Sequence, residues 1–169
     1  FFDEYYSNYY SKISKNTENF DPRRHAFQRE RGKFYFEFLI KEIGRKEFND
    51  YHFIDYGCSS GGLVKVFEEN KVKILGFDID KKAINFGKKM GVKNLTSSDP
   101  FNKINKKSPL VVILSEVLEH MEDPKSFLKN LRSKMNERSI LVISVPDLKG
   151  HLVHKRKLNF MYDLQHISY

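Results

Sequence analysis

The chain has 169 residues, a hydrophobic fraction of 40%, one cysteine and a formal net charge of +8 at pH 7. This length and composition predict a single compact domain with a real core, and a lone cysteine excludes an internal disulfide. No apolar run approaches the roughly 18 residues of a membrane-spanning helix, and with no signal peptide visible we expect a cytoplasmic protein.

Apolar runs alternate along the chain with segments of helical periodicity. This alternation predicts an α/β fold, a Rossmann-like, doubly wound and mostly parallel sheet with helices on both faces. Strands are predicted near residues 51–56, 72–78, 94–98, 109–115 and 139–145, and helices near 26–45, 61–70, 81–90 and 124–136. Residues 146–169 leave too little room for the further helix and strand pair that usually end this fold, so we expect the last strands to be missing from this fragment.

A glycine-rich turn follows the first predicted strand, at Asp55-Tyr56-Gly57-Cys58-Ser59-Ser60-Gly61-Gly62. Glycine adopts backbone angles closed to other residues and lets a ligand approach the main chain at the start of a helix. A dinucleotide fingerprint would need glycine where Ser59 stands, and Asp55 would repel a phosphate, which disfavours a nicotinamide cofactor. S-adenosylmethionine has cationic sulfonium and ammonium groups and no phosphate, so it suits Asp55.

The second predicted strand ends in Asp78, roughly twenty residues after the first glycine of the turn. This is the spacing expected of a carboxylate that recognises a ribose. We expect Cys58 to be a small residue beside the ligand and not a reactive thiol, because no histidine is adjacent in the sequence to activate it. The predicted cofactor-binding residues are Asp55, Gly57, Cys58, Ser59, Gly61, Asp78, Ile79, Asp99 and Ser115.

Four segments resemble motifs of the class I S-adenosylmethionine-dependent methyltransferases in their order and spacing. They are Phe53–Gly61, Leu75–Asp78, Ser98-Asp99 and Ser115–His120, the last of which contains the E-V-L-E-H motif similar to ubiquinone-pathway and sugar-type methyltransferases. The resemblance covers about residues 50–169 and implies an enzyme, a methyltransferase. It also implies that Asp99 binds the adenine amino group, and an ordinary cap or turn residue before Pro100 is the alternative.

The resemblance divides the chain into an N-terminal cap segment, residues 1–50, and a methyltransferase domain that binds S-adenosylmethionine, residues 51–169. The cap segment is rich in tyrosine, and related enzymes often cover the active site with such a segment. Packing of these tyrosines against the sheet is the alternative interpretation.

The E-V-L-E-H motif predicts the catalytic region. On a helical turn, Glu116, Glu119 and His120 would share one face at positions i, i+3 and i+4. We predict His120, Glu116 and His166 as catalytic residues, with His120 or Glu116 removing a proton from the acceptor. The motif also resembles the metal site of small-RNA ribose methyltransferases, which implies Mg²⁺ or Mn²⁺ on Glu116, Glu119 and His120, with a structural acid–imidazole pair as the alternative.

The favoured acceptor is a hydroxyl of a small-molecule substrate or a nucleotide-sugar. A metal-dependent RNA ribose 2′-O-methyltransferase is the first alternative, since the charge of +8 suits an anionic partner. The lysines are nevertheless spread along predicted helices, which favours a solvated surface. A non-catalytic, cofactor-binding regulatory protein is the second alternative, and the sequence leaves the oligomeric state open.

Overall fold

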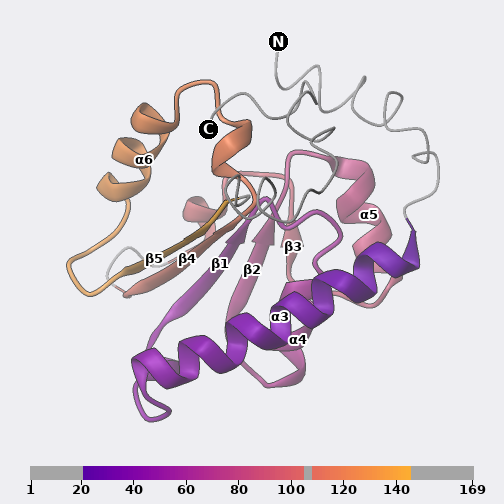
Figure 1. The fold of residues 1–169 in the computed structure, drawn as a ribbon, viewed down its shortest axis with the longest axis horizontal. Coiled ribbons are helices and arrows are strands. Elements are labelled where there is room, and N and C mark those ends of the chain that lie inside the picture. Colours follow the sequence, from indigo (N-terminus) through magenta and orange to yellow (C-terminus); the bar gives the residue numbers. More distant parts are fainter. Residues whose placement is uncertain (1–20, 105–107, 146–169) are drawn as a thin grey trace, which may run out of the picture.

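The computed structural model describes residues 21–104 and 108–145 of the chain. This part contains one parallel sheet in the order β3-β2-β1-β4-β5 (Figure 1). Each strand lies inside a predicted range, so the α/β doubly wound architecture is confirmed. The strands are β1 (His52–Tyr56), β2 (Ile74–Phe77), β3 (Leu95–Thr96), β4 (Leu110–Ser115) and β5 (Ile140–Ser144).

The described helices also match the predicted ones in number and order. They are α3 (Pro22–Ile43), α4 (Gly62–Glu69), α5 (Lys81–Lys89) and α6 (Pro124–Ser133), with 3₁₀ turns η2 (Phe48–Asp50), η3 (Pro100–Lys103) and η4 (Leu118–His120). None of these helices has both the length and the apolar content needed to cross a bilayer. The tyrosine-rich segment and His166 lie outside the described residues.

Helix α3 begins four residues earlier than predicted because of a local start signal. Asp21 accepts a hydrogen bond from the backbone nitrogen of Arg23 at 2.8 Å, and Pro22 occupies the first helical position. This acid–proline pair is a good helix start, since proline needs no hydrogen-bond acceptor there. The same signal at Asp123 and Pro124 starts α6 where the sequence predicts it.

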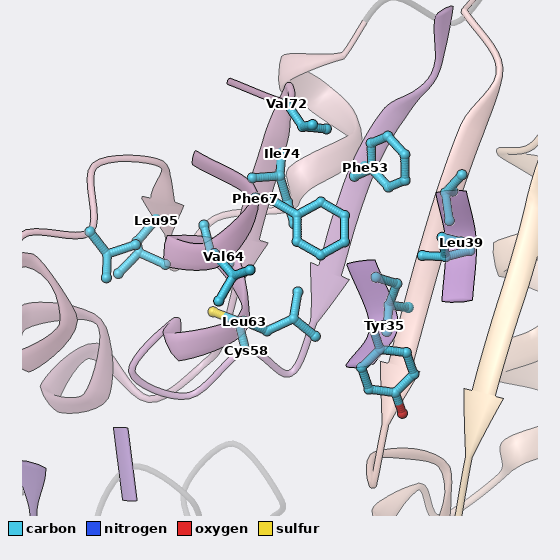
Figure 2. Close-up of a cluster of buried hydrophobic side chains, with 14 of the residues drawn as sticks. Tyr35, Leu39, Phe53, Cys58, Leu63, Val64, Phe67, Val72, Ile74 and Leu95 are labelled. Atoms are coloured by element: carbon cyan, nitrogen blue, oxygen red, sulfur yellow. The ribbon is translucent and has the colours of Figure 1, made fainter. Parts of the chain in front are cut away.

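The core divides into two clusters, one on each face of the sheet. Alternate side chains of a strand point to opposite faces, and β4 follows this rule: Val111 and Ile113 pack on the side of α3 and α4, whereas Val112 and Leu114 pack on the side of α6. Figure 2 shows the first cluster, in which Phe67 and Phe53 fill the space beside the sheet. Helices therefore cover both faces, as predicted.

Helix α3 packs closely on α4 and contributes to this core. A Cβ atom on Gly32 would lie 2.8 Å from Leu63 Cα, and one on Gly62 would lie 2.5 Å from the carbonyl oxygen of His25. Tyr35 belongs to the buried cluster although it falls within the segment 1–50 (Figure 2). The two glycines thus allow α3 to lie against the glycine-rich turn and the ends of the strands.

Candidate functional site

The glycine-rich turn between β1 and α4 requires left-handed backbone at three positions. The φ angles are 82° at Gly57, 49° at Ser59 and 72° at Gly61. At Gly57 a Cβ atom would also lie 2.5 Å from a methyl carbon of Val117, so both the backbone and the space require glycine. Ser59 adopts this conformation without being glycine, at the position where the resembling family often has one.

Asp78 fixes the turn to the end of β2. Its carboxylate accepts hydrogen bonds from the backbone nitrogens of Ser59 at 2.7 Å and Asp80 at 2.8 Å. Burial raises the pKa of Asp78 to about 6, against the effect of these two bonds. Ile79 follows directly and is exposed. The acid predicted to bind a ribose therefore lies beside the turn.

Asp55 is a buried acid at the end of β1. Burial raises its pKa to about 7, and the charge of Asp78 adds to this, while Arg31 opposes it. No described residue donates a hydrogen bond to the Asp55 carboxylate. A buried carboxylate without donors is costly unless a cation or donor satisfies it, so this acid favours a positively charged ligand.

Helix α3 brings further polar side chains to the same end of the sheet. Arg31 donates to the Glu116 carboxylate at 2.9 Å and also to Ser115 Oγ. Although burial opposes it, this contact with Glu116 raises the pKa of Arg31. The hydroxyl of Tyr35 donates to Ser144 Oγ at 2.7 Å and reaches Ser115 Oγ at 3.2 Å. Arg31 therefore carries a stable positive charge near Asp55.

A small pocket of about 50 Å³ lies where α3, the glycine-rich turn and β4 meet. Its volume corresponds to about two water molecules, so it has room for one end group of a larger ligand. Burial, together with the charges of Asp55 and Asp78, raises the pKa of the Cys58 thiol well above its usual range, which keeps it protonated and unreactive. The pocket is lined by Gln28, Arg31, Asp55, Gly57, Cys58, Leu63 and Ser115.

Asp99, after β3, forms the cap that the sequence offers as one of two interpretations. Its carboxylate accepts from the backbone nitrogen of Phe101 at 2.9 Å and from Lys134 Nζ at 3.1 Å. Burial opposes these contacts, but together they lower the pKa of Asp99. Binding of an adenine amino group by Asp99 stays a prediction.

The predicted helical face formed by Glu116, Glu119 and His120 is wrong. Glu116 has a left-handed φ of 56°, and η4 begins only at Leu118, so the three side chains do not follow helical spacing. Glu116 is exposed and pairs with Arg31. Glu119 is 3% exposed, and neither of its carboxylate oxygens has a hydrogen-bond partner among the described residues.

The metal ligands expected from the motif are therefore not brought together. In residues 21–104 and 108–145, no three or more histidine, cysteine, aspartate or glutamate side chains form a group that could hold a metal ion. Glu116 turns toward α3 and Glu119 is buried, and the catalytic role of His120 stays a prediction. His120 is partly buried.

The chain matches a family model described as a methyltransferase domain over residues 13–169. It belongs to this methyltransferase-domain family. The methyltransferase expected from the sequence motifs is thereby confirmed, and the match extends across the boundary drawn at residue 50. No curated protein matches the chain.

Solved structures share the fold of this methyltransferase. A SAM-dependent methyltransferase from Archaeoglobus fulgidus matches with a TM-score of 0.63 and 22% identity, covering 96% of this chain and 68% of that one. The plantazolicin methyltransferase BpumL, solved with a triazolic desmethylPZN analog and SAH, matches with a TM-score of 0.62 and 18% identity, covering 98% and 67%. The PH0226 protein from Pyrococcus horikoshii OT3 matches with a TM-score of 0.58 and 17% identity, covering 90% and 67%.

Sequence analysis of this methyltransferase missed the contribution of α3. Gln28, Arg31 and Tyr35 all direct polar groups toward the ends of the strands or the turn. Their spacing of three and four residues places them on one face of a helix, and this is a signal that the sequence does contain. The motifs that carry the resemblance do not include this signal, because α3 lies before the first strand.

Proposed function

We propose that this methyltransferase binds S-adenosylmethionine across the carboxyl ends of its strands and methylates a hydroxyl of a small-molecule or nucleotide-sugar acceptor. The order of the polar residues along the sheet edge is the observation that carries this proposal. Arg31 lies beside the end of β4, Asp55 ends β1, and Asp78 and Asp99 follow β2 and β3. Because the strand order is β3-β2-β1-β4, these residues form one row at the edge where ligands of such sheets bind.

The chemistry of this row fits the groups of the cofactor in the order in which they are linked. Arg31 suits the carboxylate of the amino-acid end, and Asp55 suits its ammonium group and the sulfonium. Asp78 suits the ribose hydroxyls, and Asp99 suits the amino group of the adenine. Asp55 supports the fit most strongly, since its buried carboxylate has no donor from the described residues.

The cofactor, when bound, supplies the methyl group together with its sulfonium leaving group. The chain contributes charge neutralisation by Asp55 and close approach of the backbone at Gly57, where no Cβ atom intervenes. His120 receives the proton of the acceptor hydroxyl on a ring nitrogen, because the carboxylate of Glu116 is already engaged by Arg31. Alignment of the acceptor with the methyl group is a further contribution that the site can make.

The surface next to η4 favours an acceptor with an apolar part and a negative charge. A shallow depression there has an apolar floor, and the charged side chains that line it are all cationic. This combination supports a phosphate-bearing small molecule such as a nucleotide-sugar. The depression is lined by Leu118, Pro124, Lys125, Leu128, Lys129 and Arg132.

Calorimetric titration with S-adenosylhomocysteine tests the cofactor, with NADH as the control ligand. We expect micromolar binding of the first and none of the second. Asp78→Ala should weaken binding by about 1–3 kcal/mol, since ribose donors lose their acceptor. Asp123→Ala removes the cap of α6, which is not among the predicted cofactor-binding residues, and serves as the matched control for cofactor binding. Absence of binding by the folded wild-type protein, or equal binding of NADH, would contradict the proposal.

A further inference from the structure

A buried chain of hydrogen bonds connects α3 to the glycine-rich turn. His25 is 3% exposed, and its Nδ1 lies 3.0 Å from Ser60 Oγ. The Ser60 hydroxyl donates to Gln28 Oε1 at 2.7 Å, and the same oxygen accepts from the backbone nitrogen of Gly62 at 3.3 Å. His25 and Gln28 are three residues apart and so lie on the same side of the helix.

The backbone N–H of Gly62 can only donate, so the oxygen of the Gln28 amide faces it, and this sets the protons along the chain. A hydroxyl has a single hydrogen, and Ser60 gives it to Gln28, so Ser60 must accept from the protonated Nδ1 of His25. Burial, reinforced by nearby Arg29, lowers the pKa of His25, so the ring is neutral at pH 7. His25 is therefore fixed as the Nδ1–H tautomer and holds Ser60 in place.

The backbone N–H of Gly62 fixes the orientation of the Gln28 amide. The carbonyl oxygen of this amide accepts from the backbone N–H of Gly62, which can only donate, and a flipped amide would place NH₂ against this donor. Such a flip forfeits that hydrogen bond, worth about 1 kcal/mol. The NH₂ group must then point away from the turn, and no described residue accepts a hydrogen bond from it. Gln28 lines the small pocket between α3 and Asp55.

The polar groups around this pocket are complementary to an α-amino acid. Gln28 and Arg31 offer donors from α3, and Asp55 offers a carboxylate from β1. An amino acid carries one carboxylate and one ammonium group, which need donors and an acceptor respectively. Arg31 already donates to Glu116 and Ser115, whereas the amide N–H groups of Gln28 donate to no described residue, so Gln28 can join Arg31 at the carboxylate.

We propose that Gln28 binds the carboxylate at the amino-acid end of the cofactor, and that His25 is a positioning residue that orients Gln28 through Ser60. This assignment rests on the proposed function. It differs from a purely structural role, in which Gln28 only satisfies the backbone nitrogen at the start of α4. In that case the character of its outward-facing group has no effect on the ligand.

Gln28→Glu separates the two roles because a carboxylate keeps the acceptor for Ser60 and Gly62 but replaces NH₂ with a second oxygen. S-adenosylhomocysteine and its decarboxylated analogue, titrated in parallel, report on the carboxylate alone. We expect Gln28→Glu to weaken binding of S-adenosylhomocysteine by about 10- to 100-fold, since a charged hydrogen bond is lost and like charges meet. Binding of the decarboxylated analogue should change by less than about 3-fold, because the group that is repelled is absent.

Asn85→Asp provides the matched control, because it adds the same charge at an exposed position of α5. It should leave both affinities unchanged. His25→Ala should weaken binding of S-adenosylhomocysteine by about 3- to 10-fold, and by much less in a Gln28→Ala background, since coupled residues are not additive.

Each other outcome overturns the assignment in a recognisable way. If Gln28→Glu lowers the affinity for both ligands equally, Gln28 has a structural role only. Equal affinity of the wild-type protein for both ligands would show that the carboxylate is not recognised, while the proposed cofactor would stand. If the wild-type protein binds neither ligand, the proposed function fails and the assignment fails with it.

Discussion

Replacing Asp55 with asparagine should make the ligand-free domain more stable at pH 8 while it weakens cofactor binding. Burial raises the pKa of Asp55 from 3.8 to about 7. Between these values the folded domain binds more protons than the unfolded chain, so the stability of the wild-type protein falls as the pH rises from about 4 to about 7. The shift corresponds to at most about 4 kcal/mol, and to about 3 kcal/mol over the range from pH 5 to pH 8.

Urea denaturation at pH 5 and pH 8 measures this effect. Asparagine does not titrate, so the free energy of unfolding of Asp55→Asn relative to wild type should rise by about 3 kcal/mol between the two pH values. Titration of Asp78 occurs in both proteins and largely cancels in the comparison. Binding of S-adenosylhomocysteine to the variant should be at least about tenfold weaker, because its ammonium group loses a carboxylate. A stability difference that is the same at both pH values would refute the reasoning.

Three further substitutions test separate parts of the site. His120→Gln should lower kcat by about 10²- to 10⁴-fold without weakening S-adenosylhomocysteine binding, and an unchanged kcat would remove His120 as the base. Gly57 has a φ of 82°, and a Cβ atom there would lie 2.5 Å from Val117. Gly57→Ala should therefore lower the free energy of unfolding by about 2–4 kcal/mol in urea denaturation. A smaller loss would mean that the turn can adjust. Ser59→Gly should raise the free energy of unfolding by up to about 1 kcal/mol, since the strain of a left-handed serine exceeds the entropic cost of glycine. A lower free energy of unfolding would show that the Ser59 hydroxyl makes a stabilising contact.

The strands and the glycine-rich turn could be predicted because their signals are local. A run such as Leu110–Ser115 can only be buried, and the structure buries both of its faces. Asp55 and Asp78 could be located because each follows the apolar residues of one strand, and parallel strands bring their carboxyl ends to one edge. Pattern and topology are sufficient for residues of this kind.

The catalytic motif was harder to interpret because its spacing is compatible with more than one backbone. Helical spacing separates Glu116, Glu119 and His120. The backbone N–H of Glu116 nevertheless donates to the carbonyl oxygen of Ser144, and Glu116 takes a left-handed conformation. That pairing extends the contact of β4 with β5 by one residue and delays the 3₁₀ turn. A contact to a strand 28 residues later in the chain decides the geometry, and no local pattern reports it.

The position of α3 links packing to chemistry in this domain. Gly32 allows α3 to approach the backbone of Leu63, and the residue before it, Arg31, extends to the end of β4. Gln28, three residues before Arg31, contacts the start of α4. A side chain at Gly32 would push α3 away from α4, and both polar residues would move with the helix because a helix shifts as a rigid unit over so short a distance. The glycine that serves the core therefore also sets the distance between α3 and the pocket, so packing at this point and ligand binding cannot vary independently.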